Sequence, residues 1–215
     1  MSDTAKNALR QDLKDFLDNP RTFMTSNIVL PPSNPKTKDY KTGGIKNKRS
    51  GIFQFSFAKS TTATANRPLF RIEIPEPSNQ DLPRFMAYYC HYDSDNMFSL
   101  MLDDEMNLML TPTMNGCSFG VGSETSTGAR LVAHANASRT SSDDEGKKQQ
   151  GVTQAKKIGE LITSPTIIGP SDYAQPDVYG TTVGVRKKGH WSFFMQTWFR
   201  TTATGYILKA IIDIA

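Results

Sequence analysis

The stretch Ser118-Phe119-Gly120-Val121-Gly122 decides the fold, together with the polar loop at residues 123–128 and the segment Arg130-Leu131-Val132-Ala133-His134-Ala135-Asn136-Ala137. Two short apolar segments joined by a loop of Gly, Ser and Thr predict a β-hairpin. If the chain reverses at the middle of the loop, the register puts Cys117 opposite His134. Directly opposed side chains in an antiparallel pair have Cβ atoms about 5 Å apart, so we expect the thiol and the imidazole to lie close together.

This pair has the residue types of a cysteine nucleophile and its base. A free thiol has a pKa near about 8.5 and is mostly protonated at neutral pH, and a neighbouring imidazole can deprotonate it. The backbone N–H groups at Asn115 and Gly116, just before Cys117, are candidate donors to an oxyanion. A different interpretation stays open, because a single Cys is often a small buried apolar residue and a single His often only satisfies a hydrogen bond.

The residues around His134 indicate where its side chain points. In an extended strand Val132, His134 and Asn136 share one face, and the alanines at 133, 135 and 137 share the other. A His among polar neighbours favours a cleft rather than a core. The group that orients the imidazole is left open among Thr111, Asn136 and Gln196.

The spacing of Thr111, Cys117 and His134 is similar to the Thr-x(5)-Cys…His pattern of a superfamily of glutamine deamidases. This superfamily includes the catalytic domain of the cytotoxic necrotizing factors, the Burkholderia lethal factor and the bacterial chemoreceptor deamidase. The sequence Asn115-Gly116-Cys117 resembles the small-residue–Gly–Cys element of those families, and residues 183–194 resemble the late strand pair of the necrotizing factors. The resemblance covers roughly residues 108–198.

The resemblance implies a cysteine-dependent protein-glutamine amidohydrolase of the toxin or effector type. It makes Cys117 the nucleophile and His134 the acid and base, and Thr111 orients the imidazole. It implies no metal or cofactor, and a host protein as substrate, such as a translation factor or a small GTPase. Two alternatives remain: a transglutaminase that uses the same pair, and a noncatalytic β-rich binding module in which Cys117 is packed in the core.

Composition limits the other classes of function. The chain has 215 residues, 37% of them hydrophobic, and a net charge of +4. Such a charge is too small to indicate nucleic-acid binding, and two cysteines without a spaced Cys/His cluster do not indicate a zinc site or a disulfide scaffold. We expect a monomer without a membrane span or a signal peptide, since no apolar run reaches about 18 residues. The resemblance then implies synthesis in the cytoplasm and delivery to a host cell cytosol.

Periodicity predicts an α+β fold with β-sandwich-like mixed sheets, a few flanking helices and one domain. We expect helices at about residues 3–17 and 147–162. Strands are expected at residues 53–57, 70–74, 85–92, 97–102, 106–111, 181–186, 191–200 and 206–214. The predicted organisation is an N-terminal helix and lead-in at 1–30, a flexible basic loop at 31–50, and a β-rich catalytic domain at 51–215.

Overall fold

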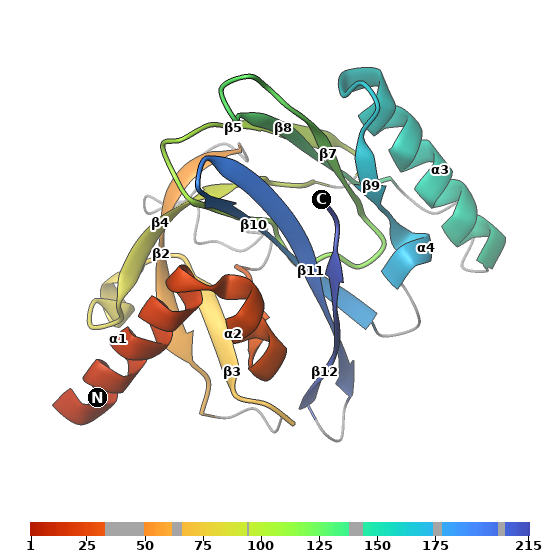
Figure 1. Ribbon diagram of the computed structural model, residues 1–215. Helices are drawn as coiled ribbons and strands as arrows, with labels where there is room; N and C mark the ends of the chain where they lie inside the picture. The colour runs from red at the N-terminus through yellow and green to blue at the C-terminus, as the bar shows by residue number, and fades with distance from the viewer. Residues whose placement is uncertain (33–49, 62–65, 94, 138–143, 174–177, 202–204) are drawn as a thin grey trace.

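Two β-sheets face each other in the computed structural model, and helices cover the outer face of each (Figure 1). The larger sheet has eight strands in the order β1-β3-β2-β4-β6-β10-β11-β12, and the smaller has four in the order β5-β8-β7-β9. The structure describes residues 1–32, 50–61, 66–93, 95–137, 144–173, 178–201 and 205–215. The expected basic loop at 31–50 therefore lies almost entirely outside the described residues.

The elements have the following bounds. The helices are α1 (Asp3–Asp18), α2 (Pro20–Ser26), α3 (Asp144–Leu161) and α4 (Pro170–Tyr173), with a short 3-10 turn, η2 (Pro77–Asn79). The strands are β1 (Ile28–Leu30), β2 (Gly51–Lys59), β3 (Leu69–Glu73), β4 (Arg84–Tyr89), β5 (Met97–Leu102), β6 (Leu108–Leu110), β7 (Ser118–Glu124), β8 (Arg130–Ala135), β9 (Thr166–Ile168), β10 (Val178–Lys187), β11 (His190–Thr201) and β12 (Gly205–Asp213).

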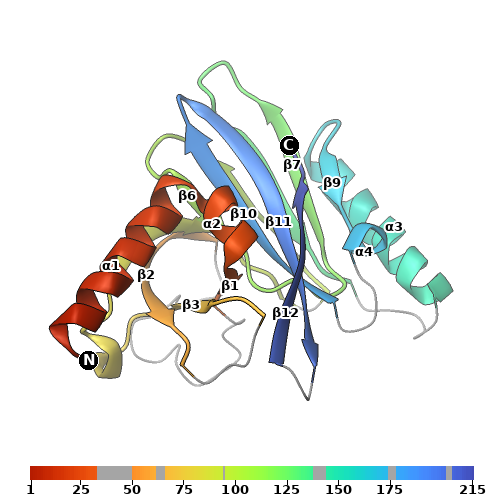
Figure 2. The same ribbon diagram turned by 60° about the horizontal axis from the view of Figure 1, so that its bottom comes forward.

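Four layers follow from these elements: α1 and α2, the large sheet, the small sheet, and α3 with α4 (Figure 2). Each interface between layers has its own cluster of buried apolar side chains. The fold is thus α+β, mostly sheet and a single compact domain, as the sequence predicts. None of the helices in the described ranges combines the length and the apolar composition that a membrane-spanning helix requires.

Helix α1 covers the large sheet with one apolar stripe. Its first turn is capped by Ser2, whose hydroxyl accepts a hydrogen bond from the Ala5 N–H at 3.3 Å. Leu13 and Phe16 lie on the buried face, and the Phe16 ring stacks on Phe57 with centroids 5.5 Å apart. Burying one such side chain contributes about 1.5–3 kcal/mol, so tertiary packing supplies most of the helix stability.

The layer between the two sheets is formed by alternate residues of the long strand β11. Trp191, Phe193 and Met195 point from β11 towards the small sheet, where Phe119 of β7 and Val132 of β8 meet them. The other face of β11 points towards α2 and is also buried. Large groups on both faces predict a strand inside its sheet, and β11 does lie between β10 and β12.

The expected hairpin is confirmed, but its expected register is wrong. Strands β7 and β8 pair with Phe119 opposite His134, so Cys117 is two residues out of the predicted alignment. The chain reverses later than the middle of the loop, because Gly128 adopts a φ of +81° and donates its N–H to the Thr125 carbonyl at 3.0 Å. A register shift between Val121 and Glu124 then takes back one residue of the offset, which leaves two at Phe119.

The other expected elements differ from the structure mainly at their ends. Residues 97–102 form a strand as predicted, whereas the strand expected at 85–92 ends at Tyr89. The three-residue strands β1 and β9 and the short helices α2 and α4 are not predicted, because segments of this length carry too little periodicity.

The contact between β7 and α3 gives a test of the outer layer. A Cβ at Gly120 would lie 2.4 Å from Cγ2 of Ile158, whereas a Cβ at Gly159 on the same helix would meet nothing within 4 Å. Gly120→Ala should therefore lower the free energy of unfolding by about 1–3 kcal/mol. Gly159→Ala should leave it unchanged or raise it by up to about 1 kcal/mol. Urea unfolding of both variants measures the difference, and equal stabilities would contradict the packing.

Candidate functional site

The loop that carries Cys117 is fixed to the large sheet just before β7 begins. Met114 and Gly180 of β10 exchange two backbone hydrogen bonds, both 2.8 Å long. Gly116 then takes a φ of +88°, a conformation that favours glycine. The chain can turn sharply there, and Cys117 enters the layer between the sheets.

Two buried side chains from the helical layer hold the backbone on either side of the sulfur. Gln154 of α3 donates from Nε2 to the Gly116 carbonyl at 2.9 Å and accepts from the Ser118 hydroxyl at 2.6 Å. The Tyr173 hydroxyl of α4 accepts from the Gly116 N–H at 3.2 Å and donates to the Cys117 carbonyl at 2.7 Å. Every polar group in this network has a partner, which makes the loop rigid.

The thiol of Cys117 is enclosed. Only 3% of the residue is exposed, and Met114, Phe119 and Tyr173 belong to the same apolar cluster. Burial raises the pKa of this thiol to about 12, while a backbone hydrogen bond from Asn115 acts in the opposite direction. The sulfur is therefore protonated at neutral pH in this structure.

His134 is enclosed as well, at the centre of the small sheet. It lies directly opposite Phe119 on one neighbouring strand and Phe98 on the other, and its ring is 5.2 Å from that of Tyr92. Burial lowers the pKa of His134 to about 3, and the charge of His91 lowers it further, whereas the Cys90 backbone raises it. Within the described residues neither ring nitrogen has a partner at full hydrogen-bond geometry. The imidazole is neutral at pH 7.

Cys117 and His134 lie on the same side of the small sheet. Val132, two residues before His134, and Phe119, two residues after Cys117, both pack between the sheets. The other face of the hairpin points to α3, since Ser118 reaches Gln154 there. Cys117 is thus a diagonal neighbour of His134, and diagonal pairs are about 7–8 Å apart. The expectation of an open cleft around His134 is wrong, because its face of β8 is the buried one.

A second thiol, that of Cys90, lies nearer to His134 than the sequence suggests. Cys90 follows β4 in the large sheet and is fully buried. Burial raises its pKa to about 12, and the backbone of His134 is among the groups that lower it. Its sulfur is 3.8 Å from the Phe98 carbonyl of β5. Nothing in the sequence signals this contact, because it depends on how the two sheets face each other.

The remaining predicted site residues have these places. Asn115 is exposed, and its backbone faces the Cys117 thiol. The N–H of Gly116 is already donated to Tyr173. Thr111, at the end of β6, is fully buried, and its hydroxyl donates to the Pro112 carbonyl at 3.0 Å.

Gln196 does not orient the imidazole, contrary to one of the three candidates named from the sequence. Its amide accepts from Val29 at 2.9 Å and donates to the carbonyls of Met24 and Asn27, both at 2.7 Å. These partners belong to the α2–β1 segment on the far side of the large sheet. Gln154 and Tyr173, by contrast, are site residues that sequence reasoning missed, since neither has a fixed spacing from Cys117.

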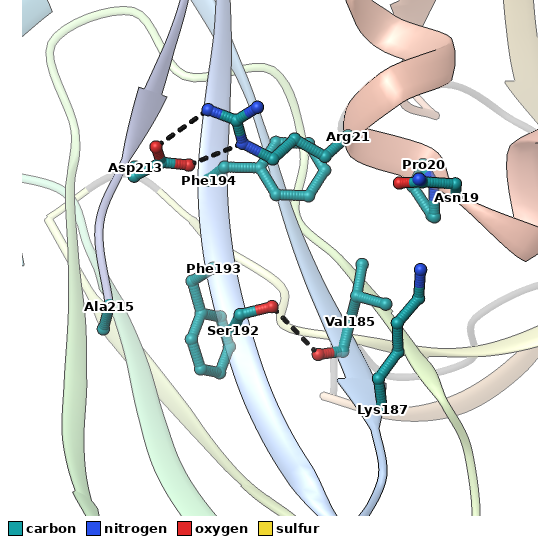
Figure 3. A pocket seen from close by; sticks show the side chains of 10 residues that line it. All are labelled: Asn19, Pro20, Arg21, Val185, Lys187, Ser192, Phe193, Phe194, Asp213 and Ala215. Atoms are coloured by element: carbon teal, nitrogen blue, oxygen red, sulfur yellow. Dashed lines mark hydrogen bonds and ion pairs between the residues drawn. The ribbon is translucent and has the colours of Figure 1, made fainter.

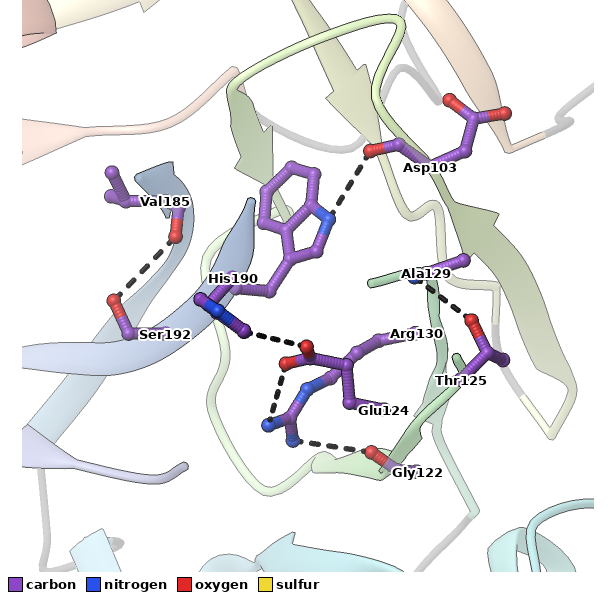
Figure 4. A network of polar contacts seen from close by, with 10 residues as sticks. Asp103, Gly122, Glu124, Thr125, Ala129, Arg130, Val185, His190 and Ser192 are labelled. Carbon is purple, nitrogen blue, oxygen red and sulfur yellow. Dashed lines mark hydrogen bonds and ion pairs between the residues drawn. The ribbon is translucent and has the colours of Figure 1, made fainter. Parts of the chain in front are cut away.

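A separate polar cluster joins the tips of two hairpins (Figure 4). Glu124, at the end of β7, contacts His190 at 2.6 Å and Arg130 at 3.5 Å. The hydrogen bond from His190 lowers the pKa of Glu124, whose side chain is 22% exposed. The side chain of His190 is 74% exposed. We assign this cluster to holding the two sheets together at one end.

The larger of two described cavities lies beside α2 (Figure 3). It has a volume of about 390 Å³, and the ion pair between Arg21 and Asp213, with two contacts of 2.8 Å, crosses its wall. Its lining contains Lys187 and Ser192 but no cysteine or histidine. Among the described residues no group of three His, Cys, Asp or Glu side chains is arranged to hold a metal ion.

The burial of His134 makes a prediction about pH. Its pKa is about 3 in the folded chain and near 6.5 in an exposed one, so between these values the unfolded chain binds one more proton. The stability due to the neutral ring is complete above about pH 6.5 and is lost as the pH falls towards 3. Between pH 7 and pH 5 this group should lower the free energy of unfolding by about 2 kcal/mol.

Urea unfolding at several pH values measures this loss. His134→Leu should lack that part of the pH dependence. His190→Gln changes an exposed ring and should keep it. An unchanged pH dependence in His134→Leu would contradict the buried, neutral imidazole.

No protein-family model matches the sequence, and neither does any curated protein. Among solved structures the chain is similar to the crystal structure of the C-terminal domain of CNFy from Yersinia pseudotuberculosis. The TM-score is 0.37 and the sequence identity 10%, and the match covers 60% of this chain and 61% of that chain.

Proposed function

We propose that the chain is a cysteine-dependent protein-glutamine deamidase whose resting form keeps its nucleophile closed. The observation that carries the proposal is the buried hydrogen-bond network of Gln154 and Tyr173, which fixes the backbone on both sides of Cys117. A cysteine that only fills space needs no such support. Nucleophiles do need it, because a reacting atom must be held within about 0.5 Å of its working position.

The shared face of Cys117 and His134 supports the same proposal. In the reaction the Cys117 sulfur attacks the carboxamide carbon of a target glutamine, and His134 takes the thiol proton. The imidazolium then protonates the departing ammonia, which leaves a thioester. Water, deprotonated by the same imidazole, hydrolyses the thioester to glutamate and restores the thiol.

Electrostatics explains why the closed form is inactive and why opening would activate it. Burial raises the pKa of Cys117 and lowers the pKa of His134, and it is the largest cause of each shift. Letting water or a polar substrate into the layer removes this cause. The thiol pKa then falls and the imidazole pKa rises, so the two groups become able to exchange a proton near neutral pH.

The sequence pattern of Thr111, Cys117 and His134 supports glutamine as the target and a host protein as the substrate. Conversion of one glutamine to glutamate adds a negative charge, and a charge placed in a functional site can inactivate a protein. The proposed site of action is therefore the cytosol of a host cell.

Mass spectrometry tests the activity. The purified chain is incubated with host-cell lysate, and peptides are searched for Gln-to-Glu conversions. Cys117→Ser should lower their rate by a factor on the order of 10³ or more. Cys90→Ser is the matched control, since Cys90 is equally buried and has a pKa raised to the same value, and it should retain the activity. Amine adducts on glutamine instead of glutamate would indicate a transglutaminase.

A second candidate, a noncatalytic β-rich binding module, is favoured by one observation: Cys117 and His134 are 3% and 0% exposed. If the chain is such a binding module, Cys117→Ser should bind the partner and act as the wild type does. Retention of the full biological effect by Cys117→Ser would therefore overturn the deamidase proposal.

A further inference from the structure

A cavity of about 250 Å³ lies beside α4, at the end of the layer between the sheets. Its walls come from α4, β10, β11 and β12. They are formed by Ser171, Asp172, Tyr173, Val178, Thr197, Lys209, Ala210 and Ile212. No residue of the cavity beside α2 takes part in it.

One side chain of the cavity lining also contacts the backbone of Cys117. Tyr173 lines the cavity, is 5% exposed, and bonds through its hydroxyl to Gly116 and Cys117. Ile212 lines the cavity too and packs against the apolar cluster that contains Cys117. Tyr173 and Ile212 thus form part of the wall between the cavity and the layer that holds the sulfur.

Strand β11 makes the two spaces continuous. Phe193 and Met195 fill the layer between the sheets, and Thr197, the next residue on that face, lines the cavity. Ala210 of β12 pairs with Thr197, and Ile212 pairs with Met195. The cavity is therefore the solvent end of the layer in which Cys117 lies.

The chemistry of the walls indicates what the cavity takes. Asp172 and Lys209 carry opposite charges, so their sum favours a neutral occupant over an ion. The Ser171 hydroxyl supplies a further donor and acceptor, and the Thr197 hydroxyl, which donates to the Ala210 carbonyl at 3.3 Å, supplies an acceptor. The volume is below the range of about 300–1,000 Å³ that is usual for whole small-molecule ligands, and it suits one side chain. A carboxamide side chain is neutral, both donates and accepts hydrogen bonds, and is of this size.

We infer that this cavity admits the carboxamide side chain of the target glutamine, and that Tyr173 is the wall that moves to let it reach Cys117. The inference rests on the proposed deamidase function. Breaking the two hydrogen bonds of the Tyr173 hydroxyl frees the ring and also loosens the loop at Gly116. Tyr173 is therefore a positioning residue in the closed form and a gate during entry.

Alkylation of Cys117 by iodoacetamide, itself a small neutral carboxamide, tests the route in the full chain. Peptide mapping after cleavage at aromatic residues separates Cys117 from Cys90. Ala210→Trp adds a large ring to the lining of the cavity and should slow the alkylation of Cys117 about tenfold or more. Ser192→Trp is the matched control. Ser192 is also a small, exposed residue of the large sheet, but it lines the cavity beside α2. This variant should leave the alkylation rate unchanged.

Tyr173→Phe keeps the ring and removes only the hydroxyl, so it should speed the alkylation at an unchanged fold, which circular dichroism checks. The inference is overturned if Ala210→Trp reacts as fast as the wild type, or if wild-type Cys117 does not react in the folded chain. Deamidation measured in parallel separates the two ideas. Full deamidation by Ala210→Trp rejects the route and keeps the enzyme, whereas cavity-dependent alkylation without any deamidation keeps the route and rejects the enzyme.

Discussion

The pairing of β7 with β8 is the constraint on which the site depends. Because Phe119 is opposite His134, the residues on their face of the hairpin are turned into the layer between the sheets. Cys117 and His134 share this layer for the same reason. The side-chain period of a strand is two, so a slip of one residue would put Cys117 and His134 on opposite faces of the small sheet. A slip of two would bring them directly opposite each other.

Burial in this layer sets the protonation of the pair. Removing water disfavours the thiolate and the imidazolium alike, and the two pKa values move apart as a result. The closed form therefore consists of two neutral groups in an apolar layer. The hydrogen bonds of Gln154 and Tyr173 keep the Cys117 loop in place while the layer stays dry. A reaction at this site requires a movement that hydrates the layer. Movement of Tyr173 would do so and would loosen the loop at Gly116, while the hydrogen bonds of Gln154 to Gly116 and Ser118 still hold the loop.

Local pattern was enough to predict much of the fold. The apolar stripe of α1, the alternation in β5 and the two-sided burial of β11 lead directly to the observed elements. The hairpin was predictable as well, but its register was not. Register depended on where the chain reverses, and the turn at Gly128 with the shift before Glu124 is not visible as a pattern.

The candidate site was predictable only in part. The residues Cys117 and His134 could be named from the sequence, but their burial could not, because alternation assigns faces without saying which face meets the other sheet. Gln154 lies 36 positions from Ser118 and 38 from Gly116, and Tyr173 lies 56 positions from Cys117. Partners this far apart in the chain leave no spacing signal. The contact of Cys90 with His134 has the same origin.

The register is tested most directly by nuclear Overhauser effects between backbone protons of β7 and β8 in the folded chain. The structure predicts cross-strand effects that pair Phe119 with His134 and Ser118 with Ala135. Effects that instead pair Cys117 with His134 as directly opposed residues would contradict this register, and with it the diagonal geometry on which the closed site rests.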